Sequence, residues 1–374
     1  MRNFGVALLS LVVVVLVTET VLRATHAFNA RVAWTEPDPE IGYRFTPGRA
    51  YWFFAENDHP VEGRINALGW RDYERARDKP AGCYRVAVLG DSYVEAFQVE
   101  LDSTFAAIAE RRLNATLEPG GRTVEFMNFG RSGMTTTEER IVLERDVFRC
   151  DPDAVVVLFT FDNDIADVNP ATATAELRPY ASLGADGSIR VDTGFARSAA
   201  YRTRVRLNPL KQRSALVSLV AERYNVWRRA PARGGHAGSA GATITRALSL
   251  CTARPDSTFL ENYRVNKALL ADMARGCAAR GVKLWIMAVP PVRDDASTAA
   301  LRARDPSFDP GFFDCDLAAL AEAAGAGFVP LTGRFAAAAR AGGEGLFWGH
   351  WNYAGHRVAA GALADALGPE ATAE

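Results

Sequence analysis

A serine follows an apolar run in the first third of the chain. Residues 84–89 are rich in valine and lead into Gly90-Asp91-Ser92, a glycine followed by two small polar residues. The run predicts a buried strand, and the glycine permits a sharp turn at its carboxyl end. Ligands of open parallel sheets bind beyond those strand ends. Ser92 is therefore a candidate nucleophile, and a serine that caps the following helix is an equally open interpretation.

Three further polar segments have the residue types that such a nucleophile needs. Residues 128–133 contain glycines, which can turn a backbone N–H toward a pocket. Asn163 follows another apolar run and offers a neutral amide donor to a developing oxyanion. His350 lies in the last predicted loop and can act as a general base. Each segment alone is explained by a glycine turn, a helix cap or a capping loop, but their order along the chain indicates a catalytic site.

That order resembles the SGNH, or GDSL-type, hydrolase family over about residues 65–366. Gly90-Asp91-Ser92 matches the nucleophile motif of the family, and His350 matches its catalytic histidine. Gly133 and Asn163 match the glycine and the asparagine of its oxyanion hole. The resemblance implies a flavodoxin-like three-layer α/β/α fold with a parallel sheet. It also implies ester hydrolysis, often of acyl groups on carbohydrate or lipid, and the lead-in resembles that of extracytoplasmic members.

The matched residues can hydrolyse an ester. Ser92 would attack the carbonyl carbon, while His350 takes the serine proton and passes it to the leaving alcohol. The N–H groups of Ser92 and Gly133 and the side-chain amide of Asn163 would stabilise the oxyanion. Each donor would lower the barrier by on the order of 3 kcal/mol.

One member of the usual catalytic triad is absent from its expected place. The family usually has an aspartate two or three residues before the histidine, where this chain has Trp348 and Phe347. Glu344 is the nearest upstream carboxylate that could orient the imidazole, and a backbone carbonyl is the alternative. Loss of a triad carboxylate lowers turnover by about 10⁴. We therefore expect a Ser92–His350 dyad that Glu344 could assist.

From residue 83 onward, short apolar strands alternate with helices, which is typical of a parallel sheet covered on both faces. The alternation stops at about residues 165–250, where we predict an insertion with a hairpin at 184–187 and a flexible low-complexity loop at 231–241. The basic amphipathic stretch at 214–229 is interpreted as a solvated helix, in preference to one that meets lipid headgroups. Expected strands are 84–89, 123–127, 154–161, 283–289 and 328–331, and expected helices are 103–113, 136–148, 259–279, 316–324 and 354–367.

The amino terminus has the composition of a membrane-targeting segment. Arg2 precedes a charge-free stretch at residues 3–18, and extension through Leu22 reaches the ~20 residues of a membrane span. A cleaved signal peptide would end near Thr25-His26-Ala27, a poor cleavage site, so an uncleaved anchor is favoured. Either interpretation places the rest of the chain outside the cytoplasm, in the periplasm. We expect an anchor or signal segment at 1–27, an extended lead-in at 28–82 and a hydrolase domain at 83–374.

The composition narrows the remaining possibilities. With 48% hydrophobic and 23% charged residues the chain is globular, and a net charge of -1 gives no general attraction to nucleic acid. No Cys, His and carboxylate residues have metal-ligand spacing, so we predict neither a metal nor a cofactor. Cys83 and Cys150 precede strands expected to be neighbours, and a disulfide between them is predicted for an oxidising compartment. Asn352 is a predicted helix cap, and His356 is predicted to pack on the last helix.

Three functions remain open at this point. The first is a membrane-anchored serine ester hydrolase that removes acyl groups from an envelope glycan, a lipid or a small ester. The second is an O-acyltransferase that passes the acyl group to a sugar hydroxyl. The third is an envelope binding protein that keeps the pocket without the triad acid. The expected partners are an acylated small molecule, glycan or lipid, and the membrane through the N-terminal segment.

Overall fold

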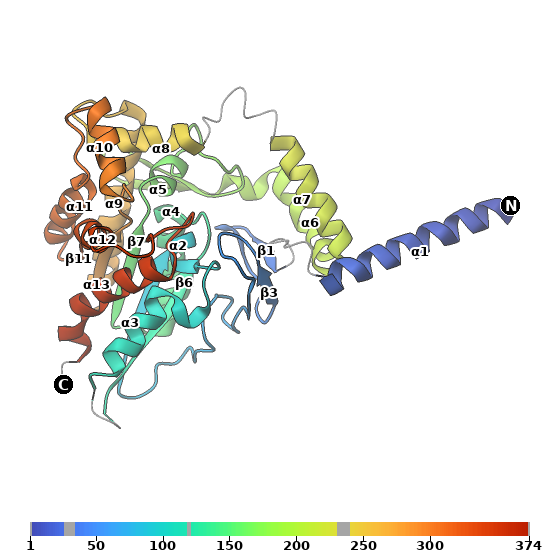
Figure 1. Cartoon of the computed structure of the whole chain (residues 1–374), viewed down its shortest axis with the longest axis horizontal. Coiled ribbons are helices and arrows are strands. Elements are labelled where there is room, and N and C mark those ends of the chain that lie inside the picture. The colour runs from blue at the N-terminus through green and yellow to red at the C-terminus, as the bar shows by residue number, and fades with distance from the viewer. Residues whose placement is uncertain (1, 26–33, 118–120, 230–239, 373–374) are drawn as a thin grey trace.

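The computed structural model describes residues 2–25, 34–117, 121–229 and 240–372 (Figure 1). At its centre is a five-stranded sheet with the order β11-β10-β7-β5-β6, in which neighbouring strands are parallel. Counted along the chain, the first strand lies between the second and the third, which is the flavodoxin-like order. The predicted α/β fold is therefore confirmed. The strands are β5 (Cys83–Gly90), β6 (Thr123–Gly130), β7 (Ala154–Phe159), β10 (Lys283–Ala288) and β11 (Gly327–Val329).

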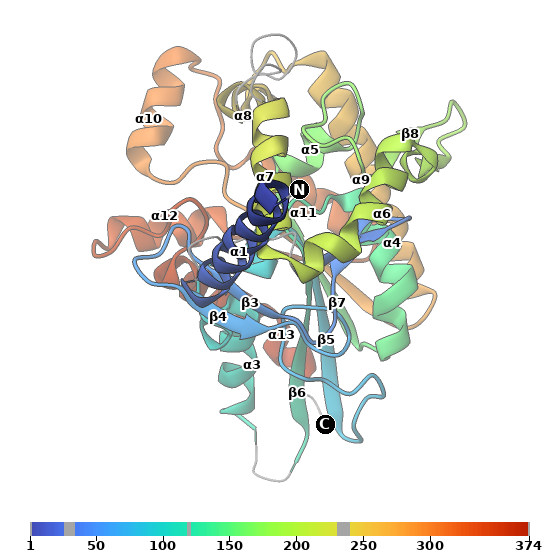
Figure 2. The same ribbon diagram turned by 90° about the vertical axis from the view of Figure 1, so that its right-hand side faces the viewer.

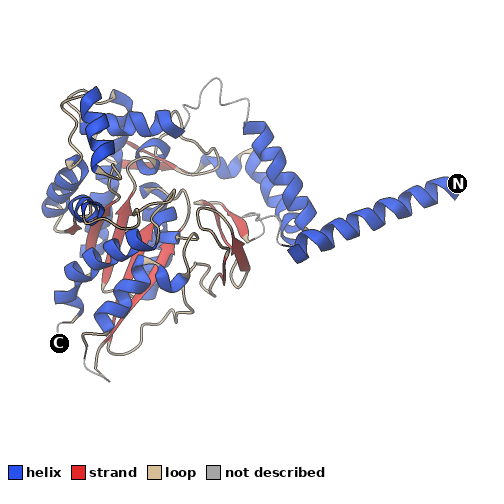
Figure 3. Cartoon of the chain, viewed as in Figure 1, coloured by secondary structure: helices blue, strands red, loops and turns tan. Residues whose placement is uncertain are grey.

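The sheet side chains alternate between two apolar cores. Val86 and Val88 of β5 face one core, and Ala87 and Leu89 face the other. Strands that are buried on both faces need continuous apolar runs, which is why the sequence pattern was readable. Figure 3 shows helices on both sides of the central strands. One side carries α3 (Phe105–Asn114), α12 (Thr332–Arg340) and α13 (Tyr353–Ala371), and the other carries α4 (Thr136–Val142), α9 (Ser257–Ala278) and α11 (Phe312–Ala323).

The lead-in is more ordered than the sequence suggested. It forms two small antiparallel sheets, β1 (Thr35–Asp38) with β2 (Gly42–Phe45) and β3 (Ala50–Phe53) with β4 (Val61–Arg64). Strands of four residues are too short to show a clear alternation in sequence. Aromatic side chains of this region pack around Phe97, which follows the first strand of the main sheet. The lead-in is thus joined to the central sheet by its own small core.

In its described part, the insertion contains the predicted hairpin and four α-helices, the first of which begins just before it. Strands β8 (Tyr180–Leu183) and β9 (Ile189–Asp192) pair in antiparallel fashion around the predicted turn, which confirms the hairpin. Residues 230–239, which hold most of the predicted low-complexity loop, lie outside the described residues. The helices are α5 (Asn163–Asp167), α6 (Ala199–Arg213), α7 (Ala215–Arg229) and α8 (Ala240–Leu248).

Helix α1 (Arg2–Thr25) projects away from the rest of the molecule (Figure 1), and Figure 2 views it nearly end-on. Its residues Asn3–Thr25 have a mean hydropathy of 2.5 in their most apolar window, and none of that window is buried in the protein. By length and composition, this helix can be a membrane span or a signal anchor. The side of the membrane on which the other residues lie remains a prediction.

The predicted disulfide is not formed. All five cysteines are free, and Cys83 and Cys150 each lie close to an oxygen atom instead. Strands β5 and β7 are neighbours as expected. However, Cys150 ends a short 3₁₀ turn before β7, whereas Cys83 is the first residue of β5. Burial raises the pKa of both thiols, which disfavours the reactive thiolate.

Candidate active site

Ser92 begins a short helix, α2 (Ser92–Glu95), directly after β5. Asp91 caps this helix and accepts a backbone N–H two residues on at 3.0 Å. The helix packs tightly on the strand ends, because a Cβ on Gly90 or Gly130 would lie 2.4 or 2.6 Å from the Val94 side chain. Glycine at the ends of β5 and β6 therefore permits the close approach that fixes the position of Ser92.

The carboxyl edge of the sheet brings three predicted residues together. Ser92 follows β5, Gly133 follows β6, and Asn163 opens α5 after β7. The strand order reverses between β5 and β7, and open α/β sheets bind their ligands at such a point. The sequence-predicted nucleophile and oxyanion residues thus share the edge at which a ligand is expected.

His350 reaches the same place from the loop between α12 and α13. Its Nε2 lies 2.8 Å from Ser92 Oγ, although the two residues are 258 positions apart. Arg293 donates hydrogen bonds to the carbonyl groups of Trp348 and Gly349 at 3.0 and 2.9 Å, which holds the loop from outside. The ring of Tyr93 packs edge-on against the imidazole, with centroids 5.0 Å apart. Backbone and ring contacts together fix the orientation of His350.

The second nitrogen of the imidazole is bonded to a carboxylate that the sequence analysis did not identify. His350 Nδ1 lies 2.8 Å from Glu56 Oε1, in the loop between β3 and β4. The backbone N–H groups of His350 and Gly349 donate to Glu56 Oε2 at 2.7 and 3.0 Å. The backbone of Glu56 has φ +70°, which is uncommon and strained for a residue with a side chain. These bonds hold the carboxylate against the ring despite that strain.

The candidate Glu344 does not occupy the predicted place. Its side chain is exposed, and the Nδ1 atom that it was expected to orient is bonded to Glu56. The two partners lie 294 positions apart, and no local motif marks Glu56. The available signal was indirect: the missing carboxylate before His350 requires one from elsewhere in the chain.

The charges around the ring favour an imidazolium–carboxylate pair. Burial disfavours protonation of His350, but the hydrogen bond and charge of Glu56, with Asp91 and Glu95 nearby, raise the pKa of the imidazole above its ordinary value. Burial likewise disfavours ionisation of Glu56, but the bonds from His350 and Gly349 hold the pKa of its carboxyl below the usual range. A proton received at Nε2 would therefore be stabilised.

Asn163 is fixed by one of its two amide hydrogens. Its Nδ2 donates to Asp91 Oδ2 at 2.6 Å, and the other amide hydrogen remains for a ligand. Burial raises the pKa of Asp91 to about 6, against the bonds that it accepts. Beside it, the Gly133 carbonyl accepts a hydrogen bond from Arg178 of the insertion, which also pairs with Glu138. The insertion therefore supports the backbone of the predicted oxyanion glycine.

Two other predicted residues have structural roles. The Asn352 side chain accepts the Gly355 N–H at 3.1 Å, which confirms it as the cap of α13. His356 is fully buried, and its Nδ1 accepts the Phe105 N–H of α3 at 3.1 Å. Burial lowers the pKa of His356 to about 3. His356 therefore packs inside the protein, as predicted, and the lowered pKa keeps it neutral.

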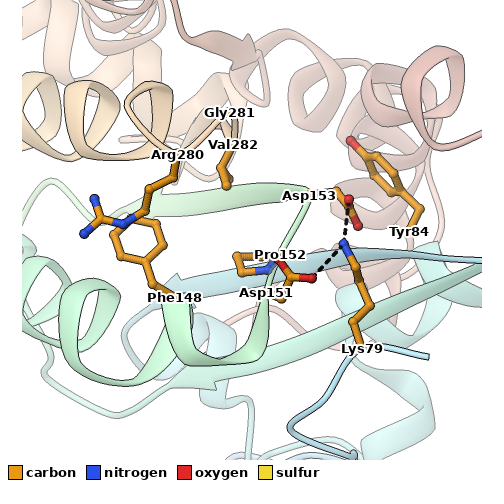
Figure 4. Close-up of a pocket in the computed structure, with 9 residues that line it drawn as sticks. All are labelled: Lys79, Tyr84, Phe148, Asp151, Pro152, Asp153, Arg280, Gly281 and Val282. Carbon is orange, nitrogen blue, oxygen red and sulfur yellow. Dashed lines mark hydrogen bonds and ion pairs between the residues drawn. The ribbon is translucent and has the colours of Figure 1, made fainter. Parts of the chain in front are cut away.

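A cavity of about 520 Å³ opens at the opposite, amino-terminal edge of the sheet (Figure 4). Lys79 lies in it between Asp151 and Asp153, with nitrogen–oxygen distances of 3.4 and 2.8 Å. Arg280 also lines the cavity, so two basic and two acidic side chains balance there, and no serine or histidine lines it. Within the described ranges, no group of three or more His, Cys, Asp or Glu residues could hold a metal ion. The chemistry of the described residues is thus concentrated at the other edge.

No family model and no curated protein matches the sequence. Solved structures are similar in fold, each over 76% of this chain. They include LAE5, an alpha/beta hydrolase enzyme from the metagenome of Lake Arreo, Spain (20% identity, 95% of that chain, TM-score 0.41). A structure of TesA is 13% identical over 98% of its length, with a TM-score of 0.39. A catalytic mutant of Axe2, an acetylxylan esterase from Geobacillus stearothermophilus, is 14% identical over 94% of its length, with a TM-score of 0.41.

Proposed function

We propose that the protein is a serine ester hydrolase of the SGNH type in which Ser92, His350 and Glu56 act as a triad. The observation that carries this proposal is a chain of two hydrogen bonds, each 2.8 Å long. One joins Ser92 Oγ to His350 Nε2, and the other joins His350 Nδ1 to Glu56. A nucleophile, a base and a group that orients the base are the parts that covalent acyl transfer requires.

Each proton can be followed through the proposed reaction. Glu56 accepts the Nδ1 proton of His350, which leaves a lone pair on Nε2 facing Ser92 Oγ. When Oγ bonds to the ester carbonyl carbon, its proton passes to Nε2. The imidazolium then gives this proton to the departing alcohol, and the acyl group remains on Ser92. Water repeats the sequence, gives its proton to Nε2 and releases the acid, and Ser92 regains a proton.

Three donors are proposed for the oxyanion. They are the Ser92 N–H at the start of α2, the Gly133 N–H and the free amide hydrogen of Asn163. Each would lower the barrier by on the order of 3 kcal/mol, because the donors are oriented before the charge develops. The bond from Asn163 to Asp91 supports this assignment, since it fixes the amide in advance.

The proposed substrates are acyl groups on an envelope glycan, a lipid or a small ester. This follows if α1 anchors the protein and the catalytic domain lies in the periplasm. The alternative of a binding protein without catalysis depended on a missing triad acid, and the contact of Glu56 with His350 supports Glu56 as that acid. Transfer of the acyl group to a sugar hydroxyl would use the same residues and differs only in the acceptor.

A fluorophosphonate probe and p-nitrophenyl acetate test the proposal directly. The full-length protein should be labelled by the probe and should hydrolyse the ester, because both reactions need an activated serine. Ser92→Ala should lose both reactions. Ser188→Ala, which removes a hydroxyl from the exposed turn of the β8–β9 hairpin, should keep them. A folded wild-type protein that neither reacts nor hydrolyses esters, or a Ser92→Ala protein that does both, would overturn the proposal.

A further inference from the structure

Helix α7 exposes an apolar stripe. Val217, Val220, Tyr224 and Trp227 recur every three or four residues and therefore lie on one face of the helix. Their side chains are 38%, 60%, 56% and 69% exposed. A solvated helix would turn polar residues outward, so the interpretation of this stretch as a solvated face does not fit the structure. The stripe calls for an apolar environment outside the described protein.

Helix α6 also exposes apolar side chains, and it adds positive charge. Val205, Leu207 and Leu210 are exposed, each at 43% or more. The same helix contains five basic residues and no acidic one. It packs beside α7, where Ser218 Oγ donates to the Lys211 carbonyl at 2.6 Å. Exposed apolar side chains interspersed with arginine and lysine are typical of helices that lie in a lipid headgroup region.

The turn between α6 and α7 is attached to the apolar N-terminal helix. Glu19 of α1 accepts hydrogen bonds from the Ser214 hydroxyl and from the N–H groups of Ala215 and Leu216, at 2.8, 2.8 and 3.0 Å. Figure 1 shows α6 and α7 lying across the end of α1 instead of continuing its axis. In Figure 2, which views α1 nearly end-on, α7 lies directly behind it. Helices α6 and α7 thus lie on the side of the molecule from which α1 projects.

The length of α1 sets the level of this turn. At 1.5 Å per residue, the charge-free residues 3–18 extend about 24 Å, which is less than the ~30 Å hydrocarbon core of a bilayer. A bilayer spanned by α1 therefore reaches at least the level of Glu19. At that level the Glu19 carboxylate accepts hydrogen bonds from the amino terminus of α7. The α6–α7 turn therefore lies at the membrane–water interface together with Glu19.

The turn is also joined to the folded domain. Gln212 donates to Thr46 Oγ1 at 2.9 Å, and its carbonyl accepts a hydrogen bond from Arg49 at 2.9 Å. Both partners belong to the lead-in, which carries Glu56 between β3 and β4. If α6 and α7 contact a membrane surface, these bonds would therefore keep the lead-in at a fixed distance from that surface.

We propose that α6 and α7 form a second membrane-contacting element, which lies in the interface of the bilayer that α1 spans. The apolar stripe faces the acyl chains, and the basic residues of α6 face anionic headgroups. The catalytic domain is then held against the bilayer and does not swing freely from α1. This inference goes beyond the proposed function and is independent of catalysis.

Nitroxide labels in the full-length protein test the contact. Val220→Cys and Trp227→Cys place a label on the stripe. Arg264→Cys places a control label at an exposed position of α9. All three are made with Cys315→Ser, because Cys315 is exposed and the other four cysteines are buried. The proteins are reconstituted in vesicles of phosphatidylcholine and phosphatidylglycerol. Power-saturation spectra then compare collisions with oxygen, which partitions into lipid, and with a water-soluble nickel chelate.

The expected result is a higher ratio of oxygen to nickel collisions at positions 220 and 227 than at 264. Equal, water-like ratios at all three positions would overturn the proposal. Dipolar broadening between stripe labels, with ratios unlike those of a lipid environment, would identify a second copy of the chain as the occupant and would also overturn it. Circular dichroism spectra and thermal unfolding midpoints equal to those of the parent protein verify that each variant is folded, whether or not the protein hydrolyses esters.

Discussion

The two regions that meet at Ser92 hold their residues in different ways. The central sheet positions Ser92, Gly133 and Asn163 at strand ends, on a scaffold buried on both faces. The lead-in contributes Glu56 from a loop between two strands of four residues each. The proposed nucleophile and oxyanion donors thus belong to the main core, whereas the group proposed to orient the base belongs to a small peripheral one. The lead-in is therefore part of the site and not a spacer.

The largest effect is expected when the two candidate carboxylates, Glu56 and Glu344, are replaced in separate variants. Glu56→Gln should lower turnover by about 10⁴, because the imidazole loses the charge and the hydrogen bond that fix its tautomer. Glu344→Gln should leave turnover unchanged, because that side chain is exposed and away from Nδ1. Steady-state ester hydrolysis measures both. Equal losses in the two variants, or none in Glu56→Gln, would contradict the assignment.

The same contrast explains what the sequence could predict. All five expected main strands begin within one residue of their observed starts, which are Cys83, Thr123, Ala154, Lys283 and Gly327. Buried parallel strands carry continuous apolar runs. The polar residues that directly follow these strands must lie at the same, carboxyl edge of the sheet. Helices α10 (Asp295–Arg304) and α12 were not predicted, because α10 has no buried residue and α12 buries only Phe335. A helix without an apolar stripe lacks the recurrence of apolar residues every three or four positions from which a helix is predicted.

Glu56 was beyond prediction for a related reason. A pairing across 294 positions is set by how the lead-in docks, through the cluster around Phe97 and the bonds from the Gly349 and His350 backbone. None of these contacts produces a periodic pattern of residues in the sequence. The sheet could therefore be predicted from local pattern, whereas the third member of the site required the tertiary structure.

A smaller loss of turnover is expected when a residue at the edge of the central sheet is replaced. Asn163→Ala should lower turnover by about 10²–10³, the usual effect of removing one oxyanion donor. Turnover should fall more than substrate affinity, because the donor acts chiefly in the transition state. Kinetics that separate kcat from KM would measure this. A rise in KM at unchanged kcat would show that Asn163 binds substrate and does not stabilise the oxyanion.

The pH dependence sharpens the role of the lead-in. Glu56 raises the pKa of His350, so Glu56→Gln should lower it. Because His350 must be neutral to accept the serine proton, the acidic limb of the rate profile should move to lower pH in this variant, even though the rate falls. An NMR titration of the imidazole, made in Ser92→Ala with and without Glu56→Gln, measures the shift without turnover. An unchanged or raised pKa would mean that the carboxylate does not act on the ring.

The smallest expected effect lies far from the site and tests whether scaffold and chemistry can be separated. Asp256 caps α9 by accepting the N–H groups of Thr258 and Phe259, both at 3.0 Å. Asp256→Ala should reduce the free energy of unfolding by about 1 kcal/mol, whereas Asp256→Ser keeps a capping oxygen and should lose less. Thermal unfolding resolves this difference. Turnover of the folded fraction should equal that of wild type in both variants, because α9 packs on the sheet and contributes no residue to the proposed triad or oxyanion hole. A change in turnover would mean that the helix layer also adjusts the strand ends, and the contrast between a rigid sheet and a docked lead-in would need revision.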